Sequence, residues 1–415
     1  MYRAPRGTQD ILPQEQPYWR YIEARAKALC QLYGYERIDT PIFEEAGLFV
    51  RSIGSGTDIV EKEMYTFPDR SGDSMTLRPE GTAPVCRVYL EHGMGSRPQP
   101  VRLYYVSPIF RYDRPQKGRY RQHHQFGVEA LGEADPLLDA EVMEMAWRFF
   151  TDLGISDFSI LLNSIGCPQC RPAYLEKLKD YYSRLAPRLC PDCRRRLEQN
   201  PLRLLDCKQA SCLPLGEDAP RSAEHLCSEC TSHFQRLRSY LDALGLPYRL
   251  DHRLVRGLDY YTRTVFEVQP SEEGAQSALG GGGRYDGLIQ ELGGRPTPGV
   301  GFAAGIERAV LALKHLGTPV PPLPRPQVCL AYLGDGLEAA RLASALRQKG
   351  IPVLMATGSR SLRAQLRQAS ALGMSYTIIL GEKELASQTV VLRDMAQGTQ
   401  REIPLADIAT ALASL

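Results

Sequence analysis

The segment Arg256–Glu267 (RGLDYYTRTVFE) combines a cation, two adjacent tyrosines and an acid directly before a strand-like run. A guanidinium stays protonated and its planar fork matches carboxylate and phosphoryl oxygens, while a phenol can both hydrogen-bond and pack against a ring. A core strand has no use for a cation beside Gly257, and an exposed loop has little use for Tyr260 and Tyr261. The segment therefore predicts a binding site for a small, polar and partly aromatic molecule.

A basic segment at residues 110–122 (FRYDRPQKGRYRQ) interleaves cations with tyrosines and contains a single acid. Its arginines are Arg111, Arg114, Arg119 and Arg121. Cations beside aromatic rings are typical of loops that reach phosphates or nucleic acid. On composition alone, a solvated hairpin that binds nothing is the alternative.

Two glycine-rich stretches follow, GGGGRYDG at 280–287 and GVGFAAGIER at 299–308. The second predicts a glycine-rich turn before an apolar helix, with Arg308 on the first turns of that helix. Such a turn lets the backbone approach a nucleotide closely. Neither stretch has the Gly-Lys-Ser/Thr sequence of a P-loop, so by themselves they are weak evidence.

Eight of the 11 cysteines lie between residues 167 and 230, and six of them form Cys-x-x-Cys pairs. They are Cys167, Cys170, Cys190, Cys193, Cys207, Cys212, Cys227 and Cys230. Paired thiolates can hold a tetrahedral Zn²⁺, and eight could form one or two four-ligand sites. Because the spacings match no standard zinc module, reduced cysteines without a metal remain the alternative. If zinc is structural there, we expect its removal to unfold this region and leave the chemistry elsewhere mostly intact.

The composition is that of an ordinary globular protein of two or three domains, with 415 residues, 43% apolar and 24% charged residues and a net charge of +2. The charge balance neither favours nor excludes a nucleic acid partner. The N-terminus lacks the apolar stretch of a secretory signal, and no run approaches the ~18 apolar residues of a membrane span. We therefore expect a cytoplasmic protein with no membrane contact.

Hydrophobic spacing predicts the elements that position these residues. A helix is expected over 14–33, and its buried face should carry Trp19, Ile22, Ala26, Leu29 and Leu32. Residues 74–90 and 100–113 read as strand-like runs alternating with loops, and 139–155 as an amphipathic helix. The cysteine-rich stretch 167–248 reads as mainly helical.

A proline-rich linker separates two parts of the chain. Residues 317–326 contain five prolines, which predicts a stiff, extended connection. Beyond it, strand-like and helical segments alternate to the end of the chain at residue 415. That alternation is typical of a compact α/β domain with parallel strand pairing.

Taken together, these segments resemble the class II aminoacyl-tRNA synthetases and, within that class, the histidyl-tRNA synthetase family. Three loose class motifs are matched by GYERIDTPIFE with Pro41, by PIFRYDRPQKGRYRQHHQFGVE and by Gly301–Arg308. Motifs particular to the histidine family are matched by RGTQD near the start, LRPEGT at 77–82, LVRGLDYYTRTVFE at 254–267 and GGGRYDGL at 281–288. The resemblance runs from about residue 3 to the end, and only the cysteine-rich stretch is variable.

The resemblance implies a multidomain α/β fold. Residues 1–325 would form a class II catalytic domain, built on an antiparallel sheet with helices and interrupted by the cysteine-rich, mainly helical insertion 167–248. Residues 327–415 would form an α/β anticodon-binding domain beyond the linker 317–326. The first motif implies a homodimer.

The implied activity is ligation of L-histidine to tRNA(His). ATP, with Mg²⁺, first converts histidine to histidyl-adenylate, and the histidyl group then passes to the tRNA 3′ end, releasing AMP and pyrophosphate. Displacement at phosphorus needs mostly positioning and electrostatic stabilisation. The catalytic residues carried over are Arg256 and Arg111, and the ATP-binding residues are Arg111, Arg119, Arg256 and Arg308.

The resemblance also assigns the histidine pocket. Glu80, Thr82 and Gln125 would bind the amino group, and Glu129, Tyr261 and Tyr285 would enclose the imidazole. Seen alone, Glu80 reads as a helix-capping carboxylate and the tyrosines as core aromatics. One departure is His123, where the family usually has Phe; we interpret it as a substituted aromatic, since adjacent histidines on a strand point to opposite faces.

Contacts to tRNA are implied in two places. Arg114, Gln116 and Arg121 match positions that face the acceptor end, where tRNA(His) carries an extra 5′ guanosine. In the C-terminal part, Arg360, Arg363 and Arg367 are spaced for one helical face. They would contact tRNA phosphates or simply form a solvated basic face.

Two other functions compete with the ligase. One is a catalytically silent, histidine-binding regulatory paralogue of an ATP phosphoribosyltransferase, which normally lacks the anticodon-binding domain and the arginine of RGLDYY. The other is a zinc-dependent nucleic-acid-binding protein, which would leave the histidine-pocket motifs unexplained. Only the ligase predicts histidine-dependent exchange of pyrophosphate into ATP.

Overall fold

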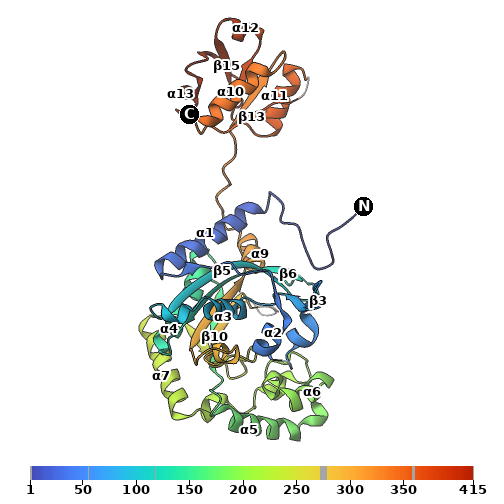
Figure 1. Ribbon diagram of the computed structural model, residues 1–415, viewed down its shortest axis with the longest axis vertical. Helices are drawn as coiled ribbons and strands as arrows, with labels where there is room; N and C mark the ends of the chain where they lie inside the picture. The colour runs from blue at the N-terminus through green and yellow to red at the C-terminus, as the bar shows by residue number, and fades with distance from the viewer. Residues whose placement is uncertain (1, 55, 117, 272–277, 358–359, 415) are drawn as a thin grey trace. The chain divides into compact units, whose positions relative to one another are not determined.

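The computed structural model describes residues 2–414 except 55, 117, 272–277 and 358–359 (Figure 1). Internal contacts divide the chain into two compact units, Met1–Pro321 and Pro322–Leu415. Within the described residues, no helix has the length and hydrophobicity that crossing a membrane requires.

The first unit is built on a large sheet that is antiparallel at all but its two edge pairs. Among the described residues it contains eight strands in the order β1-β5-β6-β11-β10-β9-β7-β8, of which only β1 with β5 and β7 with β8 pair in parallel. In that order the strands are Glu36–Arg37, Val101–Phe110, Gln122–Leu131, Gly299–Gly305, Gly280–Arg284, Thr262–Pro270, Phe158–Ser164 and Tyr248–Leu250. The antiparallel catalytic sheet expected from the sequence is therefore confirmed.

The two faces of this sheet hold different hydrophobic cores, because successive side chains of a strand point to opposite faces. On β5, Tyr104 belongs to one core, whereas Leu103 and Tyr105 belong to the other. The Tyr104 core includes side chains of α1 (Gln16–Leu32), α4 (Pro136–Asp152) and α9 (Ile306–Leu316). The Tyr105 core includes side chains of α3 (Thr82–Glu91), α8 (Leu288–Glu291) and the cysteine-rich insertion.

Helix α1 confirms the periodicity of its sequence, except at its last residue. Trp19, Ile22, Ala26 and Leu29 are buried as expected, but Leu32 is 70% exposed. The helix ends at Leu32, so this side chain lies beyond the surface that the helix covers. Helix α4 likewise lies where its apolar spacing predicts.

Residues 82–91 form helix α3, where the sequence was expected to alternate strand-like runs and loops. The Glu80 carboxylate accepts hydrogen bonds from the backbone N–H groups of Thr82 (2.7 Å) and Ala83 (2.8 Å), which caps the first turn. The apolar residues Val85, Cys86 and Tyr89 are buried at helical spacing. The capping role of Glu80 is confirmed, and the strand-like expectation was wrong because short apolar runs such as 83–86 and 88–90 fit both periods.

A small sheet and helix precede α3. β2 (Phe43–Glu45), β4 (Ser74–Leu77) and β3 (Tyr65–Pro68) pair antiparallel in that order. Helix α2 (Ala46–Ile53) and a π-helical turn (Ile59–Glu63) connect β2 to β3. The segment YGYERIDTPIFEEAGLF reads as a strand, a proline-marked bend and a helix start, and it forms β1, β2 and the first turn of α2.

The cysteine-rich insertion is mainly helical, as expected. It contains α5 (Arg171–Arg184), α6 (Pro191–Gln199) and α7 (Ser228–Ala243), joined by short 3₁₀ turns. In Figure 1, α5 and α6 lie on the side of the unit opposite α1. The insertion is not a separate module, because its leucines share one core with the tyrosines of the main sheet.

The second unit has a five-stranded sheet in its described residues, ordered β13-β12-β14-β15-β16. The strands in that order are Val353–Met355, Val328–Tyr332, Tyr376–Leu380, Thr389–Asp394 and Gln400–Pro404. The helices are α10 (Leu337–Gln348), α11 (Leu362–Ala371), α12 (Glu382–Ala386) and α13 (Ile408–Ala413). Parallel pairing was correct for β13, β12 and β14 but wrong for β15 and β16, which are antiparallel because only short connections precede them.

Candidate active site

A cavity of about 460 Å³ opens on the Tyr105 face of the main sheet. Its walls come from α3, β5, β6, β10, β11, the loop before β9 and the insertion. The expected site residues that line it are Glu80, Thr82, Arg111, Arg119, Gln125, Arg256, Tyr261, Tyr285 and Arg308. Residues more than 200 positions apart in the sequence are thus brought to one place.

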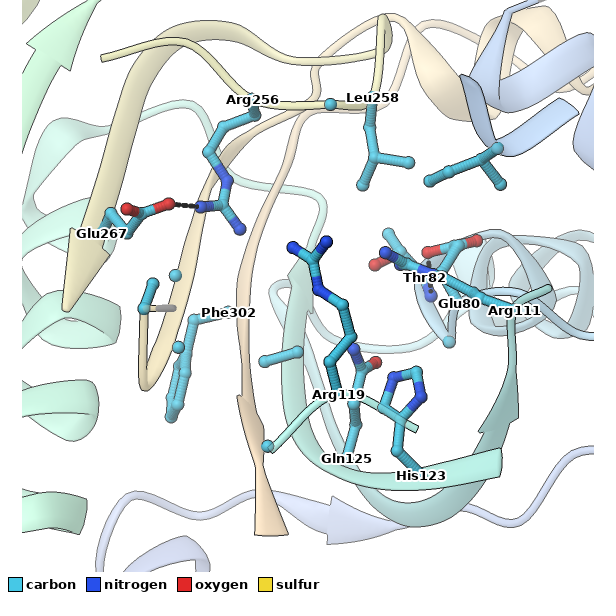
Figure 2. Close-up of a pocket in the computed structure, with 18 of the residues that line it drawn as sticks. Glu80, Thr82, Arg111, Arg119, His123, Gln125, Arg256, Leu258, Glu267 and Phe302 are labelled. Atoms are coloured by element: carbon cyan, nitrogen blue, oxygen red, sulfur yellow. Dashed lines mark hydrogen bonds and ion pairs between the residues drawn. The ribbon is translucent and has the colours of Figure 1, made fainter. Parts of the chain in front are cut away.

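Arg256 lies on the side of the cavity opposite Glu80 and Thr82 (Figure 2). Its guanidinium is paired with the Glu267 carboxylate on β9, and the other oxygen of Glu267 accepts from Gln269 Nε2 at 2.7 Å. Burial alone would lower the pKa of Arg256, but the negative charge of Glu267 raises it above its ordinary value. The Arg256 guanidinium is therefore a permanent cation, and its contact with Glu267 fixes its orientation.

Three further arginines point their charge into the same cavity. Arg111 Nε donates to the Pro79 carbonyl (2.7 Å), and Arg308 Nε donates to the Gly118 carbonyl (3.1 Å). Arg119 Nε lies 3.2 Å from Asp113 Oδ2. Burial, together with the positive charges of Arg119 and Arg111, lowers the pKa of Arg308 to about 10. In Figure 2, the Arg119 guanidinium extends into the middle of the cavity. Cations gathered this closely favour a multiply charged anion such as a triphosphate.

Glu129 is the centre of a buried hydrogen-bond network beneath the cavity. Its carboxylate accepts from Thr82 Oγ1 (2.7 Å), from the Tyr105 hydroxyl (3.2 Å) and from the Tyr285 hydroxyl. Burial raises the pKa of Glu129 from 4.5 to about 8. Glu129 itself is not part of the cavity wall; Thr82, Tyr105 and Tyr285 carry the network to the surface of the cavity. A network of this kind offers hydrogen-bonding groups that could pair with the nitrogens of a small polar ring.

Glu80 and Tyr260 join the network at the helix end. The Tyr260 hydroxyl donates to Glu80 at 3.4 Å, and the Tyr260 ring packs against Tyr261 with centroids 4.8 Å apart. Burial raises the pKa of Glu80 despite its two backbone donors. Glu80 therefore combines the capping role with a position in the cavity wall, next to Arg111 (Figure 2).

The adjacent histidines of β6 differ in environment, as strand geometry predicts. His123 lines the cavity, and burial with the nearby charges of Arg111 and Arg308 lowers its pKa to about 3. His124 contacts the edge of the Trp19 ring and lies with Nδ1 2.9 Å from Glu307. A histidine that stays neutral on the cavity side fits its interpretation as a substitute for an aromatic ring.

The residues expected at the tRNA acceptor end lie apart from the cavity wall. Arg114 and Gln116 are exposed, whereas the Arg121 guanidinium lies 3.6 Å from the centre of the Tyr112 ring. The Arg121 backbone N–H donates to the Gly7 carbonyl (2.7 Å), and Gly7 lies so close that a methyl group on its Cα would be 2.8 Å from Arg121 Cγ. Arg121 is thus built into the base of the loop.

Several residues of the site were not found from the sequence. Tyr105, Glu267, Glu307, Arg203, Asp206 and Lys208 all line the cavity, as does Tyr260, which the sequence had indicated together with Tyr261. Glu267 lies within RGLDYYTRTVFE, so that motif could have indicated it, whereas Tyr105 looks like any strand tyrosine. Arg203, Asp206 and Lys208 belong to the insertion, whose sequence carries no signal of a cavity wall.

The insertion's cysteines gather into two groups. Cys167, Cys170, Cys227 and Cys230 form one, and Cys190, Cys193, Cys207 and Cys212 form the other, each with its sulfurs within 4.8 Å of one another. All eight are free thiols. Four sulfurs at such separations could hold a metal ion in each group.

The raised pKa of Glu129 predicts a pH effect on stability. At pH values between 4.5 and about 8, Glu129 keeps its proton in the folded protein but loses it in the unfolded chain. Its contribution to the free energy of unfolding therefore falls as the pH rises. The slope is at most about 1.4 kcal/mol per pH unit. Thermal midpoints of wild type and Glu129→Gln, measured in parallel from acid to mildly alkaline pH, should show wild type losing stability relative to the variant. A constant difference between the two would contradict the assignment.

Known proteins resemble both units of the chain. Residues 7–170 and 213–309 match the family model of histidyl-tRNA synthetase, and residues 327–415 match an anticodon binding domain. A histidine–tRNA ligase of Dehalococcoides mccartyi is 60% identical over 98% of this chain and 97% of its own length. Another, from Pelotomaculum thermopropionicum, is 51% identical over 97% and 95%.

Solved structures agree with these sequence matches. The apo histidyl-tRNA synthetase of Staphylococcus aureus superposes with a TM-score of 0.82 and 38% identity, covering 99% of this chain and 100% of that one. A Bacillus halodurans protein described as an ATP phosphoribosyltransferase regulatory subunit/histidyl-tRNA synthetase shares only the fold, at 24% identity and a TM-score of 0.63. Since the stronger matches extend over nearly the whole chain, it belongs to the histidyl-tRNA synthetase family.

Proposed function

We propose that this protein ligates L-histidine to tRNA(His) in two steps, through histidyl-adenylate. One observation carries the proposal: four arginines and the Glu129 network, which suit a triphosphate and an imidazole respectively, share one cavity. A regulatory paralogue that only binds histidine would not require the Arg256 cation that Glu267 holds in the cavity wall. Localisation in the cytoplasm fits a substrate such as tRNA.

In the first step, an oxygen of the histidine carboxylate attacks the α-phosphorus of ATP, and the bond to the β-phosphate oxygen breaks to release pyrophosphate. The attacking carboxylate is already ionised at neutral pH, so no general base is needed. Arg256 and Arg111 would hold the α-phosphoryl oxygens as charge develops there, and Arg119 and Arg308 would bind the rest of the nucleotide. Mg²⁺ would bind the outer phosphates, and cavity carboxylates such as Asp113 offer it oxygen ligands.

Histidine would lie between the two polar groups of the cavity. Glu80, Thr82 and Gln125 would bind its amino group, while Tyr261 and Tyr285, the latter hydrogen-bonded to Glu129, would bind its imidazole. A ring without hydrogen-bonding nitrogens would leave these buried groups unpaired, which supports discrimination of ~10⁴-fold in comparable pockets.

The proposed activity is tested by histidine-dependent exchange of labelled pyrophosphate into ATP. We expect exchange that requires histidine and is not supported by phenylalanine or glutamine. Absence of exchange, with histidine still bound, would instead support the regulatory paralogue. Transfer of labelled histidine to tRNA(His) tests the second step.

We propose the domain organisation expected from the sequence. It comprises a catalytic domain at 1–325 with the insertion 167–248, the linker 317–326, and an anticodon-binding domain at 327–415. In the latter, Arg360, Arg363 and Arg367 are exposed, the last two on α11. We propose the insertion's cysteines as ligands of structural Zn²⁺.

The catalytic unit should form a homodimer. Ile42 and Phe43, next to Pro41 of the first class motif, are 45% and 52% exposed although apolar, which is typical of a covered interface. Light scattering at micromolar concentration should give twice the 46.3 kDa of the chain. Ile42→Asp should weaken the dimer, whereas Leu137→Asp, an exposed leucine on α4, should not. A wild type of monomeric mass would contradict the proposal.

We expect Arg114 and Arg121 to have different roles at the tRNA acceptor end, recognition of a base for Arg114 and packing of the loop for Arg121. Arg114 is exposed and could read the extra 5′ guanosine of tRNA(His), and its loss should reduce the preference for that base by ~5–150-fold, corresponding to about 1–3 kcal/mol. Replacing Arg360, Arg363 and Arg367 should weaken binding of all tRNAs and flatten the salt dependence. Kinetics with tRNA with and without the guanosine, at two salt concentrations, test both. Arg121→Ala should lose the preference too, but with a lower thermal midpoint because Arg121 supports the loop.

A further inference from the structure

The two cysteine groups have the geometry of tetrahedral metal sites. We call Cys167, Cys170, Cys227 and Cys230 the proximal site, and Cys190, Cys193, Cys207 and Cys212 the distal site. Sulfur–sulfur distances are 3.8 Å for Cys167–Cys170, 3.9 Å for Cys167–Cys227 and 3.9 Å for Cys190–Cys207. Four sulfurs ~2.3 Å from a central Zn²⁺ in a tetrahedron are ~3.8 Å apart.

Backbone donors surround the sulfurs, as expected for thiolate ligands rather than for ordinary core cysteines. Cys167 N–H donates to Cys170 Sγ (3.3 Å), Cys193 N–H to Cys190 Sγ (3.4 Å), and Cys190 N–H to Cys212 Sγ (3.2 Å). N–H groups directed at sulfur stabilise negative charge on a metal-bound thiolate. The four sulfurs of the proximal site also converge from two segments 60 positions apart in the sequence, which packing alone does not require.

The proximal site lies beside the Tyr261 end of the loop 256–261. Cys170 immediately precedes Arg171, the first residue of α5. The Arg171 guanidinium donates to the carbonyls of Ile165, Gly166 and Tyr261. Because Cys167 and Cys170 stand at the start of the insertion and Cys227 and Cys230 near its end, a shared ion would tie both ends together and fix Arg171 against Tyr261.

The distal site lies beside the other end of the same loop. Asn200, between Cys193 and Cys207, donates from Nδ2 to the Asp259 carboxylate at 2.8 Å. Arg203 contacts Gly257 so closely that a methyl there would lie 3.0 Å from its Nη1. Arg203 also lines the cavity. A distal ion would hold the segment between Cys193 and Cys207 in this position.

The insertion also packs directly against the loop, because leucines such as Leu197 and Leu205 belong to the same buried cluster as Tyr260 and Tyr261. Bound ions would add to this packing by fixing the segments that carry Arg171, Asn200 and Arg203. Metal coordination in small domains supplies folding free energy directly. The distal cysteines lie within 171–212, the stretch that the histidyl-tRNA synthetase family model does not match, whereas the proximal cysteines lie inside the matched ranges.

We propose that each site binds one Zn²⁺ and that the two ions fix opposite ends of the loop 256–261. The proximal ion fixes Tyr261 through Arg171, and the distal ion fixes Gly257 and Asp259 through Arg203 and Asn200. The inference rests on the proposed histidine activation, since Tyr261 belongs to the histidine pocket and Arg256 to the phosphate site. It replaces the expectation that zinc removal leaves histidine activation mostly intact, because the insertion forms part of the cavity wall.

Metal content and kinetics test the proposal together. Protein purified without chelator should carry two zinc atoms per chain, and the pairs Cys167→Ser with Cys170→Ser and Cys207→Ser with Cys212→Ser should each carry one. In pyrophosphate exchange, the proximal pair should raise the KM for histidine about tenfold or more, and the distal pair should lower kcat and raise the KM for ATP by similar factors. Cys329→Ser, in the second unit, is the control and should change neither metal content nor kinetics.

Two variants outside the cysteines keep the test decisive if a cysteine variant fails to fold. Arg171→Ala should keep two zinc atoms and reproduce the proximal kinetic change, while Asn200→Ala should keep two and reproduce the distal one. Iron in place of zinc, fewer than two zinc atoms, or the same kinetic change from both variants would overturn the proposal. A wild type that carries two zinc atoms but shows no exchange would instead refute the proposed function.

Discussion

Arg256→Ala should lower the rate of histidine-dependent pyrophosphate exchange by ~10²–10³-fold or more, the loss typical of one preorganised contact to developing charge. Arg256 is partly buried in the cavity wall, and Glu267, itself bonded to Gln269, fixes its guanidinium. A water molecule in its place would have to reorient during the reaction. Histidine affinity should change far less, because the expected histidine contacts lie on the other side of the cavity.

The comparison variants separate charge from geometry. Arg256→Lys keeps the charge but loses the planar fork, so it should recover only part of the rate. Glu267→Gln should leave the cation in place but less firmly oriented, with a smaller loss. Arg249→Ala removes an exposed arginine of β8 and should have no effect. If Arg256→Ala exchanges pyrophosphate within tenfold of wild type, Arg256 is not the residue that stabilises the transition state.

The sequence predicted best those elements whose hydrophobic spacing extends over several turns. Helices α1 and α4 lie where periodicity placed them, because long amphipathic segments have only one face to bury. Residues 82–91 were missed because their helix is short and begins at a cap, Glu80, that also belongs to the site. Strands β15 and β16 were expected in the correct domain but with parallel pairing, whereas they pair antiparallel. The alternation of strands and helices in a sequence does not show how each connection runs, and the connection decides whether two strands are parallel.

The residues of the candidate site were predictable from motifs, but the side chains that hold them in position were not. The arginines and tyrosines that the resemblance assigned line one cavity. What holds them, such as Glu267 behind Arg256 and Arg171 behind Tyr261, depends on side chains meeting across the fold. Those contacts join residues up to 90 positions apart and leave no local pattern in the sequence.

The glycines of GVGFAAGIER were recognised in the sequence, but their structural role was not. They were expected to form a turn that lets the backbone approach a nucleotide, but residues 299–305 form β11, a strand inside the main sheet. Gly301 pairs with Glu129 of β6, so any side chain there would stand beside that carboxylate on the same face of the sheet. A methyl group on Gly301 would overlap the Glu129 carboxylate and the Val128 carbonyl. The glycine is needed to make room for Glu129.

Gly301→Ala should therefore abolish most histidine activation without touching any residue that contacts phosphate. The added methyl must displace Glu129, and with it the hydrogen bonds from Thr82 and Tyr285 that shape the histidine pocket. Misplacement of about 1 Å in such a constellation can cost ~10²-fold, so we expect a loss of that order, with a raised KM for histidine.

Its matched control is Gly47→Ala on α2, where a methyl meets nothing within 4 Å and the backbone is helical. That variant should be as active as wild type and slightly more stable, because alanine favours a helix over glycine by about 1 kcal/mol. Gly301→Ala should also lower the thermal midpoint, since β11 must shift from β6 to relieve the overlap with Val128. A Gly301→Ala protein with a wild-type KM for histidine would mean that the position of the Glu129 carboxylate does not govern the pocket. The network beneath the cavity would then support the sheet and take no part in reading the imidazole ring.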